Sequence, residues 1–244
     1  MQDGIAVEEQ QGSLEKGLAG DYSLNLKELL GEAWRRVDGN KALIWKAMLM
    51  YIVLAVLLSL VFGFLTGGSG DADAAELPSI GEVIGDLVTT VVLMPVGVGL
   101  VFLATAIALG RVPNPKSIFA WYDNTLRLAL TYVLMWILVM IGFLLLILPG
   151  IYLAVSYQFA LPLAVDKKLG PWESLEASRK VIGHRWFTVF GYNLVIAIVI
   201  AVSSLLLAIP FIWTLPAVLI AYGILYRNLV GIEPATLDRV LAEN

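Results

Sequence analysis

The sequence predicts an all-α integral membrane protein with six transmembrane helices arranged as three hairpins, and three observations support this fold class. The 244-residue chain is 59% hydrophobic and 15% charged, with a mean hydropathy of +0.83. A soluble domain of this size contains roughly 45–50% apolar and about 25% charged residues. Six apolar segments of spanning length follow one another, and all 16 lysines and arginines fall on one side of the topology they predict. Together these observations exclude the soluble enzyme folds.

The chain begins with a polar segment that is followed by an amphipathic one. Residues 1–20 are charged and lack an apolar core, so we expect a disordered cytoplasmic tail and no signal peptide. Between residues 21 and 41, apolar side chains recur every three or four positions, with charged side chains on the opposite face. This pattern predicts a helix that lies in the cytoplasmic interface of the membrane. Its apolar positions are Leu26, Leu29, Leu30, Ala33, Trp34 and Val37.

Each predicted span is an apolar segment close to the ~20 residues that cross ~30 Å of hydrocarbon. The second contains Pro95, which is expected to kink it, and the third is expected to stop at a turn formed by Pro149 and Gly150. The fourth has only 15 residues, so it crosses only if Asp166, Lys167 and Lys168 lie in the headgroup layer; a re-entrant segment is the alternative. The spans are expected over residues 42–65, 83–109, 126–148, 151–165, 187–208 and 214–229.

The distribution of charge orients these spans. The loop over residues 66–82 carries Asp71, Asp73, Glu76 and Glu82 and no cation, whereas the cations lie in the stretches assigned to the other side. Because cations mark cytoplasmic loops, both termini are expected in the cytoplasm. The acidic loop is interpreted as a soluble connector rather than a metal site. The expected parts are a disordered tail (1–20), an interfacial helix with the first hairpin (21–109), a second hairpin (110–165), an interfacial helix with the third hairpin (166–229) and a cytoplasmic tail (230–244).

An internal repeat relates the first and last of these units. At an offset of 144 residues, EAWRRVDGNK at 32–41 lies over EASRKVIGHR at 176–185, and seven of the ten columns match or exchange lysine for arginine. Each copy ends an amphipathic stretch and leads directly into a span. Both copies start on the cytoplasmic side, so the sequence predicts parallel rather than inverted repeats.

Residues 147–191 resemble a family of bacterial inner-membrane proteins. The motifs that carry the likeness are LPGIY at 148–152 and GPWESLEASR at 170–179. They are similar to YciC-type proteins and to the membrane domain found fused to some glycerophosphodiester phosphodiesterases. The resemblance implies a multipass protein of the bacterial plasma (inner) membrane, built of helical hairpins. It implies no catalytic residues, and phosphodiesterase activity is not expected.

Cations beside tryptophans are the feature from which we predict function. Such rings favour the headgroup layer, where each cation gains ~1 kcal/mol from anionic lipid. Membrane phospholipids are therefore the expected partners, together with a possible protein partner in the membrane. The predicted headgroup ligands are Arg35, Arg36, Lys41, Arg179, Lys180 and Arg185, and the predicted interfacial anchors are Trp34, Trp45, Trp121, Trp172 and Trp186.

Composition also limits the chemistry. A net charge of −4 argues against nucleic acid as a partner, and one histidine, His184, with no cysteine argues against catalytic and metal sites. We therefore expect a non-enzymatic protein without a cofactor that acts in envelope or lipid homeostasis or as a scaffold. A transporter or channel for a small or lipidic solute is the alternative, with Asp86, Gln158 and Asn193 as its candidate polar site.

Overall fold

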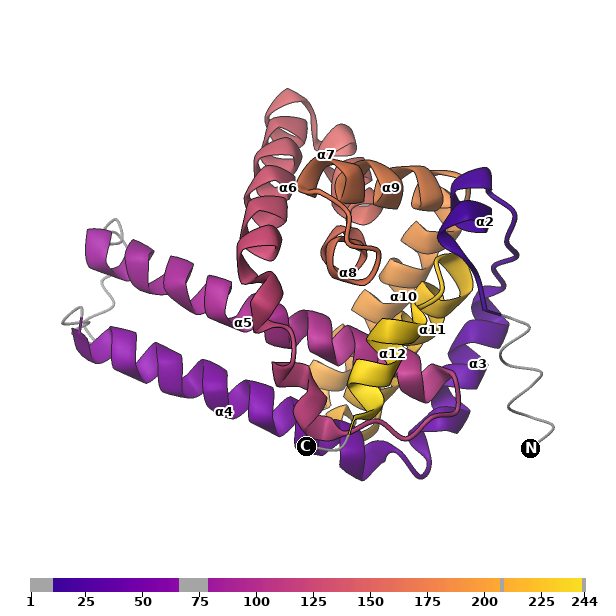
Figure 1. The fold of residues 1–244 in the computed structure, drawn as a ribbon, viewed down its shortest axis with the longest axis horizontal. Helices are drawn as coiled ribbons and strands as arrows, with labels where there is room; N and C mark the ends of the chain where they lie inside the picture. Colours follow the sequence, from indigo (N-terminus) through magenta and orange to yellow (C-terminus); the bar gives the residue numbers. More distant parts are fainter. Residues whose placement is uncertain (1–10, 66–78, 207–208, 243–244) are drawn as a thin grey trace.

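The computed structural model describes residues 11–65, 79–206 and 209–242, and every regular element in these ranges is a helix (Figure 1). Six helical stretches are long and apolar enough to cross a membrane, by length and composition. The elements are α2 (Leu14–Ala19), α3 (Leu26–Val37), α4 (Lys41–Leu65), α5 (Ile80–Ala108), η1 (Pro115–Phe119), η2 (Tyr122–Asn124), α6 (Thr125–Leu145), α7 (Ile147–Ser156), α8 (Ala160–Asp166), α9 (Pro171–Gly183), α10 (Trp186–Leu205), α11 (Phe211–Leu229) and α12 (Pro234–Leu241).

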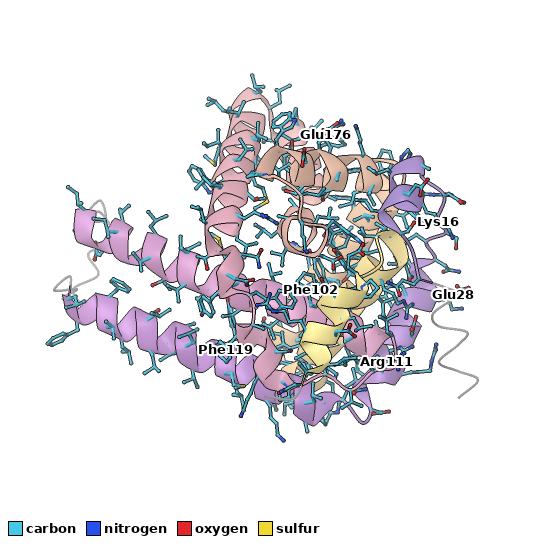
Figure 2. The ribbon with its side chains drawn as sticks, viewed as in Figure 1. Lys16, Glu28, Phe102, Arg111, Phe119 and Glu176 are labelled. Carbon is cyan, nitrogen blue, oxygen red and sulfur yellow. The ribbon has the colours of Figure 1, made fainter. Side chains whose placement is uncertain are left out.

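The centre of the molecule is the second half of α5, which packs against α3, α11, α12 and η1 (Figure 1). Phe102 of α5 is fully buried there, whereas Lys16, Glu28 and Glu176 lie at the periphery (Figure 2). The first half of α5 lies beside α4, and both expose large apolar side chains along this length. An apolar surface on long helices is what a lipid environment requires, so the observed exposure agrees with membrane insertion.

Residues 11–20 are ordered, so the expected disordered tail is wrong for this part of the chain. Helix α2 is capped by Ser13, whose hydroxyl accepts from the amide of Lys16 at 3.2 Å, and it ends at Gly20 with φ of 74°. The backbone amide of Gly12 donates to the carbonyl of Arg227 at 2.9 Å, and Gly17 is buried against α9 and the end of α11. The segment is fixed by backbone contacts that hydropathy does not reveal. Residues 1–10 lie outside the described ranges.

The predicted amphipathic helix is present as α3, but protein rather than lipid covers its apolar stripe. Leu29, Ala33 and Val37 are each at most 3% exposed and belong to the core, where α3 packs on α11. Trp34 is 56% exposed. Helix α9, which the predicted repeat pairs with α3, likewise buries Val181 and Ile182. The stripe therefore packs on protein, because hydropathy cannot tell which apolar surface covers a stripe, and the interfacial position of the helix stays a prediction.

The third span ends earlier than predicted. Helix α6 stops at Leu145, Leu146 is extended with φ of −164° and ψ of 153°, and α7 begins at Ile147. Pro149 and Gly150 therefore lie in the first turn of α7, and the prediction of a turn at these residues is wrong. Proline is tolerated in a first turn because its missing N–H has no partner there. Because Gly150 has no Cβ, the ring of Phe143 can pack closely against its backbone.

The fourth apolar stretch consists of two helices, α7 and α8, which are separated by a turn at residues 157–159. Figure 1 shows α8 end-on, while α6 lies across the view. The turn between α7 and α8 is bridged by Ser178 of α9, whose hydroxyl donates to the carbonyl of Ser156 at 2.7 Å and accepts from the amide of Phe159 at 3.2 Å. The turn interrupts the predicted segment 151–165, although α7 and α8 together, as Ile147–Asp166, are long and apolar enough to cross a membrane.

The C-terminal region closes the core instead of forming a tail. Asp166, 3% exposed, accepts from the Tyr226 hydroxyl at 2.9 Å and from the backbone amide of Glu233 at 3.0 Å, which ties α8 to α11 and α12. Lys167 pairs with Glu233 at 2.6 Å. Asp166 thus lies inside the protein and is held by protein partners. The carbonyl of Val240 in α12 accepts from the Asn114 amide at 3.1 Å, so α12 also holds the η1 segment.

Candidate functional site

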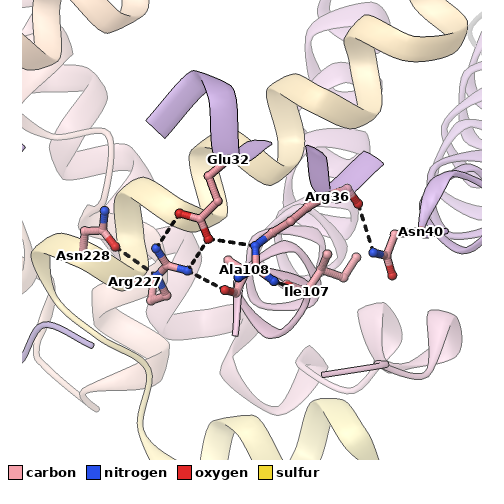
Figure 3. A network of polar contacts seen from close by, with 7 residues as sticks. All are labelled: Glu32, Arg36, Asn40, Ile107, Ala108, Arg227 and Asn228. Atoms are coloured by element: carbon pink, nitrogen blue, oxygen red, sulfur yellow. Dashed lines mark hydrogen bonds and ion pairs between the residues drawn. The ribbon is translucent and has the colours of Figure 1, made fainter. Parts of the chain in front are cut away.

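A network of ion pairs and hydrogen bonds joins α3, α5 and α11 (Figure 3). Arg227 of α11 is 2% exposed, and its Nη1 and Nη2 donate to the two carboxylate oxygens of Glu32 in α3 at 2.8 and 2.9 Å. Nη1 also donates to the carbonyl of Ala108, the last residue of α5, and Nε donates to the side chain of Asn228 at 2.9 Å. The two-pronged geometry is specific to arginine and fixes α3, α5 and α11 relative to one another.

Arg36 completes this network from the other side of Glu32. Its Nε donates to Glu32 at 2.7 Å and its Nη1 to the carbonyl of Ile107 at 3.0 Å. Burial alone would raise the pKa of Glu32, but the hydrogen bonds and charges of Arg227 and Arg36 outweigh it and hold this pKa below the usual value. Two guanidinium groups thus satisfy carbonyls at the negative end of α5. Arg36 therefore has a structural role here in addition to its predicted role as a headgroup ligand, which stays a prediction.

The other predicted headgroup ligands divide into paired and unpaired cations. Arg179 donates two hydrogen bonds to Glu176, at 2.8 and 2.9 Å, and Lys180 lies 3.5 Å from the same carboxylate. The hydrogen bond from Arg179 lowers the pKa of Glu176. Within the described ranges, Arg35 and Arg185 are exposed and have no carboxylate at ion-pair distance. Lys41 is partly buried and also has no carboxylate at ion-pair distance in the described ranges; its ammonium lies 4.7 Å from the ring centroid of Trp213.

The predicted tryptophan anchors also divide. Trp34 and Trp172 are 56% and 60% exposed, and Trp45 donates its Nε1 hydrogen to the carbonyl of Ile212 at 3.0 Å. Trp121 is 2% exposed, so its prediction as an anchor is wrong. It lies between η1 and η2, which pack on α5, and its ring meets that of Phe102 edge-on at 4.7 Å. Hydropathy alone cannot separate a tryptophan under a packed turn from one in a headgroup layer.

Trp186 and Arg185 lie together in a pocket of about 610 Å³ at the start of α10. We call it the headgroup pocket; it is lined by Tyr152, Gly183, His184, Arg185, Trp186, Phe187 and Thr188. The Trp186 ring lies 5.7 Å from that of Tyr152 and stacks on Phe190 at 5.0 Å, while Phe187 is 85% exposed. Helix α10 has no acidic residue in its first turn and no side-chain cap, so its amides reinforce the positive charge of Arg185.

The predicted polar site Asp86, Gln158 and Asn193 is not brought together. Gln158 lies in the turn between α7 and α8 and lines a cavity with Thr89 and Thr90 of α5. Asp86 is exposed three and four residues before these threonines, so it lies on the same face of α5 but outside the cavity lining. Asn193 lies on α10 and is not among the lining residues.

Sequence reasoning missed Arg227, which it treated only as a cytoplasmic cation. The one available signal is its position in the last turn of an apolar helix, before an apolar LVGI run. Among the described residues no group of three or more acidic or histidine side chains could hold a metal ion; Asp71, Asp73 and Glu76 lie outside them. Comparison with known proteins found no matching family model, no similar curated protein and no similar solved structure, so the resemblance to YciC-type proteins stays a prediction.

Proposed function

We propose that the protein is a non-enzymatic, multipass protein of the bacterial inner membrane that binds anionic phospholipid through the headgroup pocket. The observation that carries this proposal is Arg185, an exposed cation without an acidic partner in the described ranges, set among aromatic rings at the start of an apolar helix. Cations of this kind gain ~1 kcal/mol each from an anionic leaflet, and the aromatic side chains are of the type that anchors at the headgroup level.

The proposed repeat supports this assignment. At the offset of 144 residues, Arg185 corresponds to Lys41, whose ammonium lies 4.7 Å from the ring centroid of Trp213. Both positions therefore combine a cation with an aromatic ring where an apolar helix begins. In this proposal the chain forms three hairpins with both termini in the cytoplasm, and the lipid contacts serve envelope or lipid homeostasis or hold the protein as a scaffold.

Reversing the charge at Arg185 tests the proposal. In Arg185→Glu we expect the anionic phospholipid that copurifies per mole of protein to fall at least about fivefold, since one cation contributes ~1 kcal/mol. The measurement is lipid quantification by mass spectrometry after extraction in a mild detergent. Lys27→Glu, which changes the net charge equally at an exposed lysine outside the pocket, is the control. Equal lipid content in both variants would contradict the proposal.

A transporter of a small or lipidic solute is the second candidate. It is favoured by the interruption between α7 and α8, because interrupted helices beside a cavity form the substrate sites of many transporters. The two candidates differ in one observable, because only a transporter moves solute across the bilayer. Solute flux into proteoliposomes is therefore the measurement that separates them.

A further inference from the structure

A cavity of about 390 Å³ lies where α4, α5 and α11 meet the turn between α7 and α8. We call it the turn cavity. Its volume falls near the lower end of the ~300–1,000 Å³ typical of small-ligand sites. Among the described residues no charged side chain lines it, and its walls are predominantly apolar. The lining residues are Tyr51, Thr89, Thr90, Leu93, Met94, Gly97, Val98, Val101, Gln158, Leu161, Pro162 and Tyr222.

The amide of Gln158 is the unusual group of this cavity. Its Nε2 is buried and has no hydrogen-bond partner within the described ranges. The backbone carbonyl of the same residue accepts from the Tyr222 hydroxyl at 2.5 Å, so the turn that carries the side chain is fixed by α11. A buried amide that makes no hydrogen bond costs ~1–3 kcal/mol. This cost is offset if an external acceptor occupies the cavity.

Thr89 and Thr90, the two threonines of the lining, differ from two other threonines of the long helices in the hydrogen bonding of their hydroxyls. Thr105 and Thr131 each donate to the carbonyl one turn earlier, at 2.8 Å. In the part of the chain that the structure describes, Thr89 and Thr90 have no such bond. The cavity therefore offers unpaired donors from α5 as well as from Gln158.

We infer that the turn cavity binds an acyl group, with its hydrocarbon chain against the apolar wall and its carbonyl oxygen accepting a hydrogen bond from Gln158. The side-chain NH2 group of Gln158 donates hydrogen bonds, so it requires an acceptor, and a carbonyl oxygen is such an acceptor. The absence of charge from the lining disfavours an ionic headgroup in the cavity. The inference rests on the proposed membrane placement, which supplies acyl groups, and does not depend on the headgroup pocket.

Photolabelling of the reconstituted full chain tests this inference. The probe is a phosphatidylethanolamine whose ester-linked chain carries a diazirine, diluted into phosphatidylethanolamine and phosphatidylglycerol vesicles. We expect labelled peptides to be enriched over residues 89–101 and 158–162, and this labelling to fall about fivefold in Gln158→Leu. Asn193→Leu, which removes an amide from α10 outside the cavity, is the matched control and should keep the labelling.

Two further arms define the ligand. A diether analogue of the probe lacks the carbonyl, so it should label the wild-type cavity several-fold less, a result that does not depend on the folding of any variant. A fatty acid that carries a diazirine distinguishes a free fatty acid from a phospholipid as the ligand. Stronger labelling of the cavity by the fatty acid or by the phosphatidylethanolamine probe supports the inference and identifies which of the two binds. Equal labelling by ester and diether probes, or labelling spread evenly over the exposed helices, would overturn it. Arg185→Glu should keep the cavity labelling, so failure of the headgroup proposal is recognised separately.

Discussion

Replacing Arg227 by leucine is expected to lower the free energy of unfolding by about 3–5 kcal/mol, the usual cost of breaking a buried ion pair from one side. The loss leaves Glu32 with Arg36 as its only remaining cationic partner in the described network, and it removes the donor at the carbonyl of Ala108. Because the network joins α3, α5 and α11, these helices should loosen together. The measurement is unfolding in mixed detergent micelles, followed by tryptophan fluorescence.

Two variants make this first prediction specific. Lys180→Ala removes a cation that is 55% exposed and pairs with Glu176, and it should cost no more than ~1 kcal/mol. The double variant Glu32→Gln with Arg227→Met removes both buried charges of the main pair, so it should recover part of the loss seen in Arg227→Leu. If Arg227→Leu were as stable as Lys180→Ala, the network would not hold the helices together.

The contact between α5 and α11 is expected to be sensitive to one added methyl group. A Cβ at Gly223 would lie 2.5 Å from the carbonyl carbon of Ala104 and 2.6 Å from the amide nitrogen of Thr105, both backbone atoms of α5. Backbone cannot yield as a flexible side chain does, so the helices must separate. We expect Gly223→Ala to lower the free energy of unfolding by about 1–3 kcal/mol, measured in the same unfolding assay.

The same substitution elsewhere should have the opposite sign. A Cβ at Gly191 of α10 would meet no atom of the described chain within 4 Å beyond its own helix backbone and chain neighbours. Alanine favours a helix by ~0.8–1 kcal/mol over glycine, so Gly191→Ala should stabilise the protein slightly. Equal effects of Gly223→Ala and Gly191→Ala would show that α5 and α11 do not pack as closely as described.

The long helices were predictable from sequence because continuous apolar runs are a strong signal for spans. The expected segment 42–65 is observed as Lys41–Leu65, and the expected 187–208 as Trp186–Leu205. The amphipathic period of α3 was equally clear, since Leu29, Ala33 and Val37 recur on one stripe. Such patterns depend on neighbours along one helix, which the sequence contains directly.

The features that sequence reasoning missed depend on contacts between distant segments. Arg227 is buried because Glu32, 195 residues away, meets it, and no local pattern encodes that pairing. The break between α7 and α8 is satisfied by Ser178 from another helix, so the apolar run continues through it without a hydropathy signal. Trp121 and residues 11–20 are ordered by tertiary packing of the same kind.

Cysteine labelling tests most directly the central claim that a bilayer separates the basic surface of this protein from the acidic loop. The chain contains no cysteine, so single reporters at Arg35, Lys180 and Glu82 can be introduced without background. An impermeant maleimide added to intact cells should label the reporter at Glu82, and should label those at Arg35 and Lys180 only after permeabilisation. Labelling of Arg35 and Lys180 reporters from opposite faces of the membrane would contradict the account.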